Sequence, residues 1–148
     1  MPNWAVGSIR LRGKRDDIIR FLRDGLECYG NNVNVEDDGE EVSVSASNGY
    51  IHIKNTRRNF ILNKSFSAWL VNEPSTMVIE NFQSAWSVEA QEFVEIAQVY
   101  NLDIRIDASE CGTDFEQKIV IENGEIVCDN TFNYDDWMCE ARHPNWGG

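Results

Sequence analysis

The sequence predicts an α+β fold of ferredoxin-like type, with two β-α-β halves, an antiparallel sheet and both helices on one face, plus extra hairpins and a central insertion. Short runs of alternating apolar and polar residues flank two segments of helical periodicity. Two Asn-Gly pairs separate alternating runs, a pattern typical of hairpins. The length of 148 residues, 42% of them hydrophobic, suits one domain with a core. We therefore expect a single domain over residues 1–148.

The first half opens with a predicted strand over residues 4–11, where apolar residues alternate with polar ones. Gly13 breaks this pattern. A helix is predicted over residues 16–28, because its apolar residues recur every three or four positions. This apolar stripe consists of Ile18, Ile19, Leu22 and Leu26.

A hairpin is predicted over residues 42–54, with Ser47-Asn48-Gly49 as its turn. Residues 55–74 match no single period, so they are treated as a central insertion of undefined structure and role.

The second half repeats the order of the first. Its predicted elements are a strand over residues 77–83, a helix over 88–100 that Ser87 precedes, a strand over 102–108 and a hairpin over 118–128. The hairpin turn is Glu122-Asn123-Gly124, which has the same Asn-Gly chemistry. The tail beyond residue 133 contains Trp137 and Trp146, and its last residues are expected to be loose.

Neither a secretory signal pattern nor a run of eighteen apolar residues is found in the sequence, so we expect an intracellular protein without a membrane span. The four cysteines include no C-x-x-C pair and are expected to be reduced thiols.

The formal net charge of −12 is unevenly distributed along the chain. Residues 1–75 carry ten basic and ten acidic residues, whereas residues 76–148 carry three basic and fifteen acidic ones. Such a field attracts basic surfaces and repels phosphate backbones. Solubility alone is the simpler explanation of the charge.

Two segments carry a family resemblance. The first is Pro2-Asn3-Trp4 at the start of the first strand. The second begins with the run from Asn81 to Ser87, which precedes the second helix. After that helix it continues with Glu110-Cys111-Gly112-Thr113-Asp114-Phe115 and a hairpin. The chain thereby resembles the uncharacterised ferredoxin-like proteins of bacteriophages and plasmids, the YubB or Api type. The resemblance implies a ferredoxin-like fold and a mobile-element origin in the cytoplasm of a bacterial host, but no activity.

The leading functional hypothesis is a non-enzymatic binding protein that contacts a host or defence protein with a basic surface. Its acidic half would imitate nucleic-acid phosphates, with candidate residues Asp103, Asp107, Glu110 and Asp114. Four tryptophans in or next to predicted loops are either interface anchors or core residues: Trp69, Trp86, Trp137 and Trp146. Homo-oligomerisation through a sheet face or edge is left open.

The alternative hypothesis is a nucleic-acid-binding module that uses Arg10, Arg12, Arg57 and Arg58. Sheets that bind RNA carry aromatic residues beside basic ones. The segments around Arg10 and Arg12 suggest acidic neighbours and cross-strand salt bridges rather than stacking aromatics. Together with the net charge of −12, this makes nucleic acid the less favoured partner.

No catalytic, cofactor or metal site is predicted. A zinc site that gathers Cys111, Cys128, Cys139 and His143 is conceivable, but the spacing is unlike that of structural zinc sites. Glu110 and Asp114 form an acid pair around Gly112, which is more typical of a polar turn than of acid-base chemistry.

Overall fold

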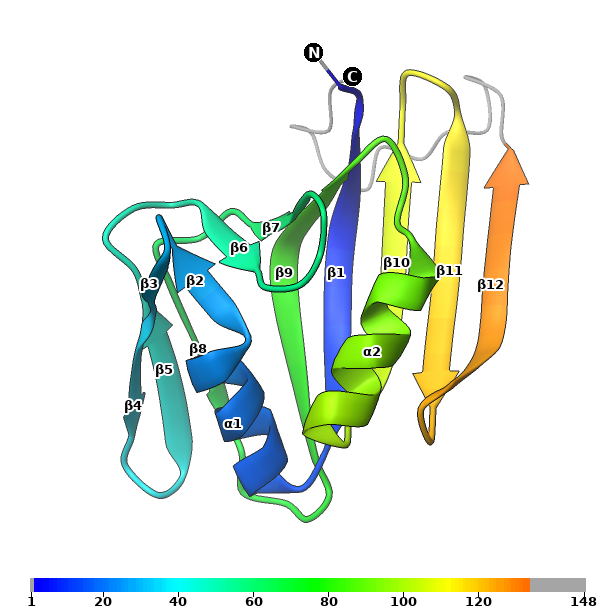
Figure 1. Cartoon of the computed structure of the whole chain (residues 1–148). Coiled ribbons are helices and arrows are strands. Elements are labelled where there is room, and N and C mark those ends of the chain that lie inside the picture. Colours follow the sequence, from blue (N-terminus) through cyan, green and yellow to red (C-terminus); the bar gives the residue numbers. More distant parts are fainter. Residues whose placement is uncertain (1, 134–148) are drawn as a thin grey trace.

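The computed structural model describes residues 2–133, and Figure 1 shows how their elements are arranged. These residues form two helices and twelve strands, and the expected α+β class is confirmed. In chain order the elements are β1 (Trp4–Gly13), α1 (Arg15–Asp24), β2 (Leu26–Cys28), β3 (Asn31–Asn32), β4 (Asn34–Asp37), β5 (Glu41–Ser45), β6 (Ile51–Ile53), β7 (Asn59–Ile61), β8 (Ser65–Trp69), β9 (Ser75–Ala85), α2 (Ala90–Tyr100), β10 (Asp103–Glu110), β11 (Phe115–Glu122) and β12 (Glu125–Asn133).

The strands are divided between two antiparallel sheets. Nine strands follow the order β12-β11-β10-β1-β9-β7-β6-β2-β3, and three follow the order β4-β5-β8. The long strands β9 and β10 pair with β1 on either side of it. The short strands β7, β6 and β2 extend the sheet beyond β9. A four-stranded ferredoxin-like sheet is not evident in this arrangement.

Both helices lie on the same face of the nine-stranded sheet (Figure 1). Alternate residues of each strand point to this face, and the apolar ones among them are buried, as Ile9 of β1 and Ile106 of β10 illustrate. α1 adds Phe21 to the core and α2 adds Phe93. The opposite face of the same sheet carries neither helix and is called the helix-free face below.

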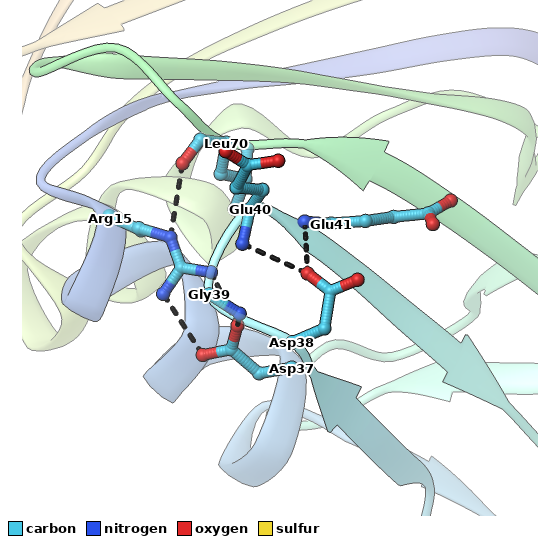
Figure 2. Close-up of polar contacts among 7 residues, drawn as sticks. All are labelled: Arg15, Asp37, Asp38, Gly39, Glu40, Glu41 and Leu70. Atoms are coloured by element: carbon cyan, nitrogen blue, oxygen red, sulfur yellow. Dashed lines mark hydrogen bonds and ion pairs between the residues drawn. The ribbon is translucent and has the colours of Figure 1, made fainter.

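Arg15, the first residue of α1, joins this helix to the three-stranded sheet (Figure 2). Its Nε donates to the carbonyl of Leu70 at 3.0 Å, and both terminal nitrogens donate to the carboxylate of Asp37, one of them at 2.9 Å. Asp37 also accepts a hydrogen bond from the backbone N–H of Gly39. These contacts, chiefly the one with Arg15, lower the pKa of Asp37 to about 2.

The end of the first helix differs from the prediction. α1 ends at Asp24, and Leu26–Cys28 forms strand β2 instead of the last turn of the helix. A Cβ at Gly25 would lie 2.6 Å from the ring of Phe21, so this tight exit requires glycine. Leu26 is fully buried in the sheet opposite Ile53. A buried apolar residue at this position fits both the end of a helix and a short strand, so the sequence pattern could not distinguish them.

The hairpin predicted over residues 42–54 is wrong. β5 pairs with β4 and β8 in the small sheet, whereas β6 pairs with β2 and β7 in the large one. The Oδ1 of Asn48 accepts the backbone N–H of Tyr50 at 2.8 Å, which forms an Asx turn between the two sheets. The expected Asn-Gly turn is therefore a crossing from one sheet to the other.

The second half of the prediction is largely confirmed. β9 and β10 contain most of the predicted strands, and α2 begins at Ala90, two residues later than predicted. Asn123 and Gly124 have φ values of 52° and 74°, as the tight hairpin between β11 and β12 requires. The undefined insertion contains β7 and β8. The tail with Trp137 and Trp146 lies outside the described residues.

Neither helix within residues 2–133 is long and apolar enough to cross a membrane.

Candidate binding surface on the helix-free face

Four ring side chains meet on the helix-free face and are called the aromatic cluster: Trp4 of β1, Tyr50, His52 of β6 and Phe60 of β7. Phe60 is the centre of the cluster. Its ring centroid lies 6.1 Å from that of Trp4, 6.5 Å from that of Tyr50 and 5.3 Å from that of His52. The contacts with Trp4 and Tyr50 are edge-to-face, the arrangement that ring quadrupoles favour.

Strand pairing explains why these rings gather. Phe60 is opposite Gln83 of β9 on one side and opposite His52 of β6 on the other. Its neighbours along β7, Asn59 and Ile61, are buried on the helix side, so alternation turns Phe60 to the helix-free face. Tyr50 lies just before β6 and is 58% exposed. The cluster thus combines packed rings with one well-exposed edge.

His52 is held by two oxygen acceptors. Its Nδ1 lies 2.8 Å from the Oε1 of Glu27, and its Nε2 lies 3.0 Å from the carbonyl oxygen of Thr56. A ring fixed at both nitrogens has little freedom to rotate, so His52 packs against Phe60 as a rigid side chain.

Arg57 and Arg58 stand beside the aromatic cluster. The guanidinium carbon of Arg58 lies 5.5 Å from the centroid of the Trp4 ring, within range of a cation-π contact. The backbone N–H of Arg57 donates to Glu92 of α2 at 2.8 Å. Both arginines are exposed and line a hollow with Trp86, whose side chain is 57% exposed, and with the acidic residues Glu89 and Glu92. Cationic and aromatic groups therefore adjoin at this end of the sheet.

Arg10 and Arg12 lie farther along β1 on the same face, separated from Arg57 and Arg58. The predicted cross-strand salt bridge is confirmed for Arg12, whose terminal nitrogen lies 2.7 Å from the Oδ2 of Asp103. The hydrogen bond to Asp103 raises the pKa of Arg12. Arg105 forms its ion pair along its own strand, with Asp107 at 3.0 Å.

The four acidic candidate residues are not brought together. Asp103 and Asp107 lie on the helix-free face in contact with arginines. Glu110 is 1% exposed, and its carboxylate accepts the backbone N–H groups of residues 112 and 113 in the turn after β10. Asp114 takes a left-handed backbone in that turn, with φ of 54°. This geometry matches the polar turn considered from sequence, with Asp114 rather than Gly112 in the left-handed region.

Residues 2–133 contain no group of three or more His, Cys, Asp or Glu side chains placed to hold a metal ion. No disulfide joins Cys28, Cys111 and Cys128. Cys139 and His143, the other members of the conceivable zinc site, lie outside the described part of the chain.

The sequence interpretation missed the aromatic cluster, although part of its signal was present. Strand alternation over residues 4–11 puts Trp4 on the same side as Arg10 and Arg12. The position of Phe60 on this face could not be predicted, because Phe60 lies in residues 55–74, which match neither a helix nor a strand period.

Comparison with protein-family models, with curated proteins and with solved structures finds no match to this chain.

Proposed function

We propose that this chain is a non-enzymatic binding domain that takes single-stranded nucleic acid on its helix-free face. The observation that supports this most directly is the aromatic cluster with Arg58 stacked on Trp4. Single-stranded nucleic acids bind to proteins through bases stacked on aromatic rings and phosphates paired with cations. Both kinds of group lie next to each other here, on a sheet face that neither helix covers.

The strongly negative net charge does not oppose this surface everywhere. Glu95 belongs to α2, which packs on the other side of the sheet, whereas Glu89 and Glu92 line the hollow beside Arg57 and Arg58. On the helix-free face, Asp103 and Asp107 are each in contact with an arginine. At the aromatic cluster itself, the carboxylate of Glu27 contacts His52 and the guanidinium of Arg58 lies over the Trp4 ring, so the surface that would face a strand carries charges of both signs.

A ferredoxin-like core extended by insertion is the topology we propose for the same chain. β1, α1 and β2 form one β-α-β unit, and β9, α2 and β10 form the other. The order β10-β1-β9, with β2 beyond the inserted strands β7 and β6, supports this assignment. β7, which carries Phe60, then belongs to the insertion. The centre of the proposed binding surface therefore lies in the insertion too.

The rival function is binding to a basic host or defence protein through an acidic face. It has less support, because Glu110 is buried in a turn and Asp103 is paired with Arg12. In either case, the resemblance to phage and plasmid proteins favours action in a bacterial cytoplasm.

Fluorescence anisotropy with a labelled oligothymidylate of about ten nucleotides tests the proposal. The informative variant is Tyr50→Ala, because Tyr50 is exposed and does not belong to the buried core. Its matched control is Tyr29→Ala, whose side chain is 81% exposed on the turn between β2 and β3. We expect Tyr50→Ala to weaken binding about fivefold or more, as the loss of one stacked base predicts, and Tyr29→Ala to leave it unchanged.

Failure of the wild-type chain to bind the oligonucleotide at low salt would contradict the proposal, and so would equal effects of the two tyrosine variants. Capture of a basic protein whose binding depends on Asp103 and Asp107 would support the rival function instead.

A further inference from the structure

Two arginines lie directly opposite each other at the centre of the helix-free face. Arg10 of β1 pairs in register with Arg105 of β10, and the row continues to Val78 of β9 and Val120 of β11. Both arginines are exposed. Like charges in directly opposite positions destabilise a sheet. Placing two cations here thus has a cost in stability, which a bound anion would remove.

The nearby carboxylates are engaged elsewhere. Asp103 accepts two hydrogen bonds from Arg12, at 2.7 and 3.1 Å, and one from the backbone N–H of Asn123 at 3.0 Å. Asp107 is bound by the Nε of Arg105 at 3.0 Å. Arg10 has no ion pair within the described residues. The guanidinium of Arg10 and the terminal nitrogens of Arg105 therefore remain available to an added anion.

A shallow hollow on this face is lined by Arg10, Arg105, Arg12 and Thr76. Thr76 supplies a hydroxyl group, which is a common phosphate contact in nucleic-acid complexes. Asp103 also lines the hollow, together with Glu122, and both carboxylates lie toward Arg12. The opposed arginine pair is thus the cationic side of the hollow, and guanidinium groups are well matched to phosphate oxygens.

We infer that Arg10 and Arg105 bind a backbone phosphate of the same nucleic-acid strand whose bases stack on the aromatic cluster, so that the strand runs along β1. This inference rests on the proposed function. β1 links the two sites, because Trp4 and Arg10 are on the same side of it, six residues apart. That separation is about 20 Å along an extended chain. A stacked strand rises about 3.4 Å per nucleotide, so the path spans at most about six nucleotides.

The test compares two double variants that remove the same charge. Arg10→Gln with Arg105→Gln removes the opposed pair. Lys14→Gln with Arg23→Gln removes two exposed cations at and within α1, on the other face. Anisotropy is measured with an oligothymidylate of about ten nucleotides from about 50 to about 200 mM NaCl.

We expect the opposed-pair variant to bind the long oligonucleotide at least about tenfold more weakly than the control variant. Its slope of log affinity against log salt should be shallower by about 0.7, which corresponds to one phosphate that is no longer neutralised. An oligonucleotide of about three nucleotides is too short to span both sites. Binding of that short strand, measured by competition, should depend on Tyr50 and not on the opposed arginines.

Each failure has its own signature. Equal binding and equal salt slopes of the two double variants, with Tyr50→Ala still defective, would overturn the path along β1 and leave the proposed function standing. Absence of binding by the wild-type chain would overturn the proposed function itself. Since removal of like charges relieves repulsion, the opposed-pair variant is expected to fold, and its circular dichroism spectrum checks this.

Discussion

The guanidinium of Arg58 lies over the indole ring of Trp4, with 5.5 Å between its central carbon and the ring centroid. The two residues come from different parts of the sheet. The backbone N–H of Ala85 in β9 donates to the carbonyl of Arg58, and Ala85 is in register opposite Trp4 of β1. Arg58 therefore reaches across β9 to stack on Trp4, and this joins a cation to the aromatic cluster that we propose as a base-stacking surface.

Substitution of Arg58 tests the electrostatic part of the proposal. With Arg58 at one phosphate and the pair Arg10 and Arg105 at another, the slope of log affinity against log salt should be about −1.4 for a single strand. Arg58→Gln should make it shallower by about 0.7 and weaken binding. Arg58→Lys, which keeps the charge but loses the planar stack, should restore the slope and only part of the affinity. A salt titration of all three proteins gives both quantities, and identical slopes would exclude Arg58 as a phosphate contact.

Arg10 provides a prediction in which stability and binding change in opposite directions. Arg10→Thr removes the like-charge contact with Arg105 and introduces a residue with high strand propensity. We expect the free energy of unfolding to rise by about 0.2–1 kcal/mol, while the affinity for the oligonucleotide falls. Urea denaturation measures the first effect and anisotropy the second. A loss of stability would show that Arg10 has a structural role instead.

Gly7 is predicted to be irreplaceable at the contact between β1 and β10. A Cβ at this position would lie 1.8 Å from the backbone oxygen of Asp107, a distance that only backbone movement can relieve. Gly7→Ala should reduce the free energy of unfolding by about 3 kcal/mol. Gly49→Ala is the control, because nothing lies within 4 Å of the Cβ position there. Denaturation of both variants checks the prediction, and similar stabilities would contradict the tight approach of these two strands.

The contact between Arg15 and Asp37 predicts a loss of stability in acid. The folded-state pKa of Asp37, about 2, is below the ordinary aspartate value of 3.8, so the unfolded chain binds the proton more tightly. The contribution of this carboxylate is therefore complete above about pH 4 and is lost as the pH falls toward 2. As the pH is lowered from about 4 to about 2, the midpoint temperature of thermal unfolding should fall less steeply for Asp37→Asn than for the wild type. Parallel curves would show that the ion pair does not stabilise the folded chain.

Two Asn-Gly pairs show what the sequence could and could not predict. Asn123 and Gly124 join strands that pair with each other over their whole length, and local turn chemistry was sufficient to identify the hairpin. Asn48 and Gly49 follow Val44 and precede Ile51, which are both buried but belong to different sheets. Which sheet a short apolar run joins depends on distant partners, and local pattern carries no information about them.

The candidate site was predictable to the same extent. Alternation predicted one side of β1 for Arg10 and Arg12, and the structure places Trp4 on that side as well. The proposed site also needs the partners of these residues, Phe60 beside Trp4 and Arg105 opposite Arg10. These contacts depend on the register between strands far apart in the sequence. The acidic hypothesis had the same weakness, because the sequence could not show that Glu110 is buried in its own turn.

The most direct test of the binding surface is a titration of the ¹⁵N-labelled chain with an oligothymidylate of about ten nucleotides, followed by two-dimensional ¹H–¹⁵N NMR. The account predicts concentration-dependent shifts of the Trp4 indole N–H and of the amides of Arg58, Phe60 and Arg10, with little change in α1. Shifts confined to α1 and the three-stranded sheet, or no shifts at low salt, would contradict it.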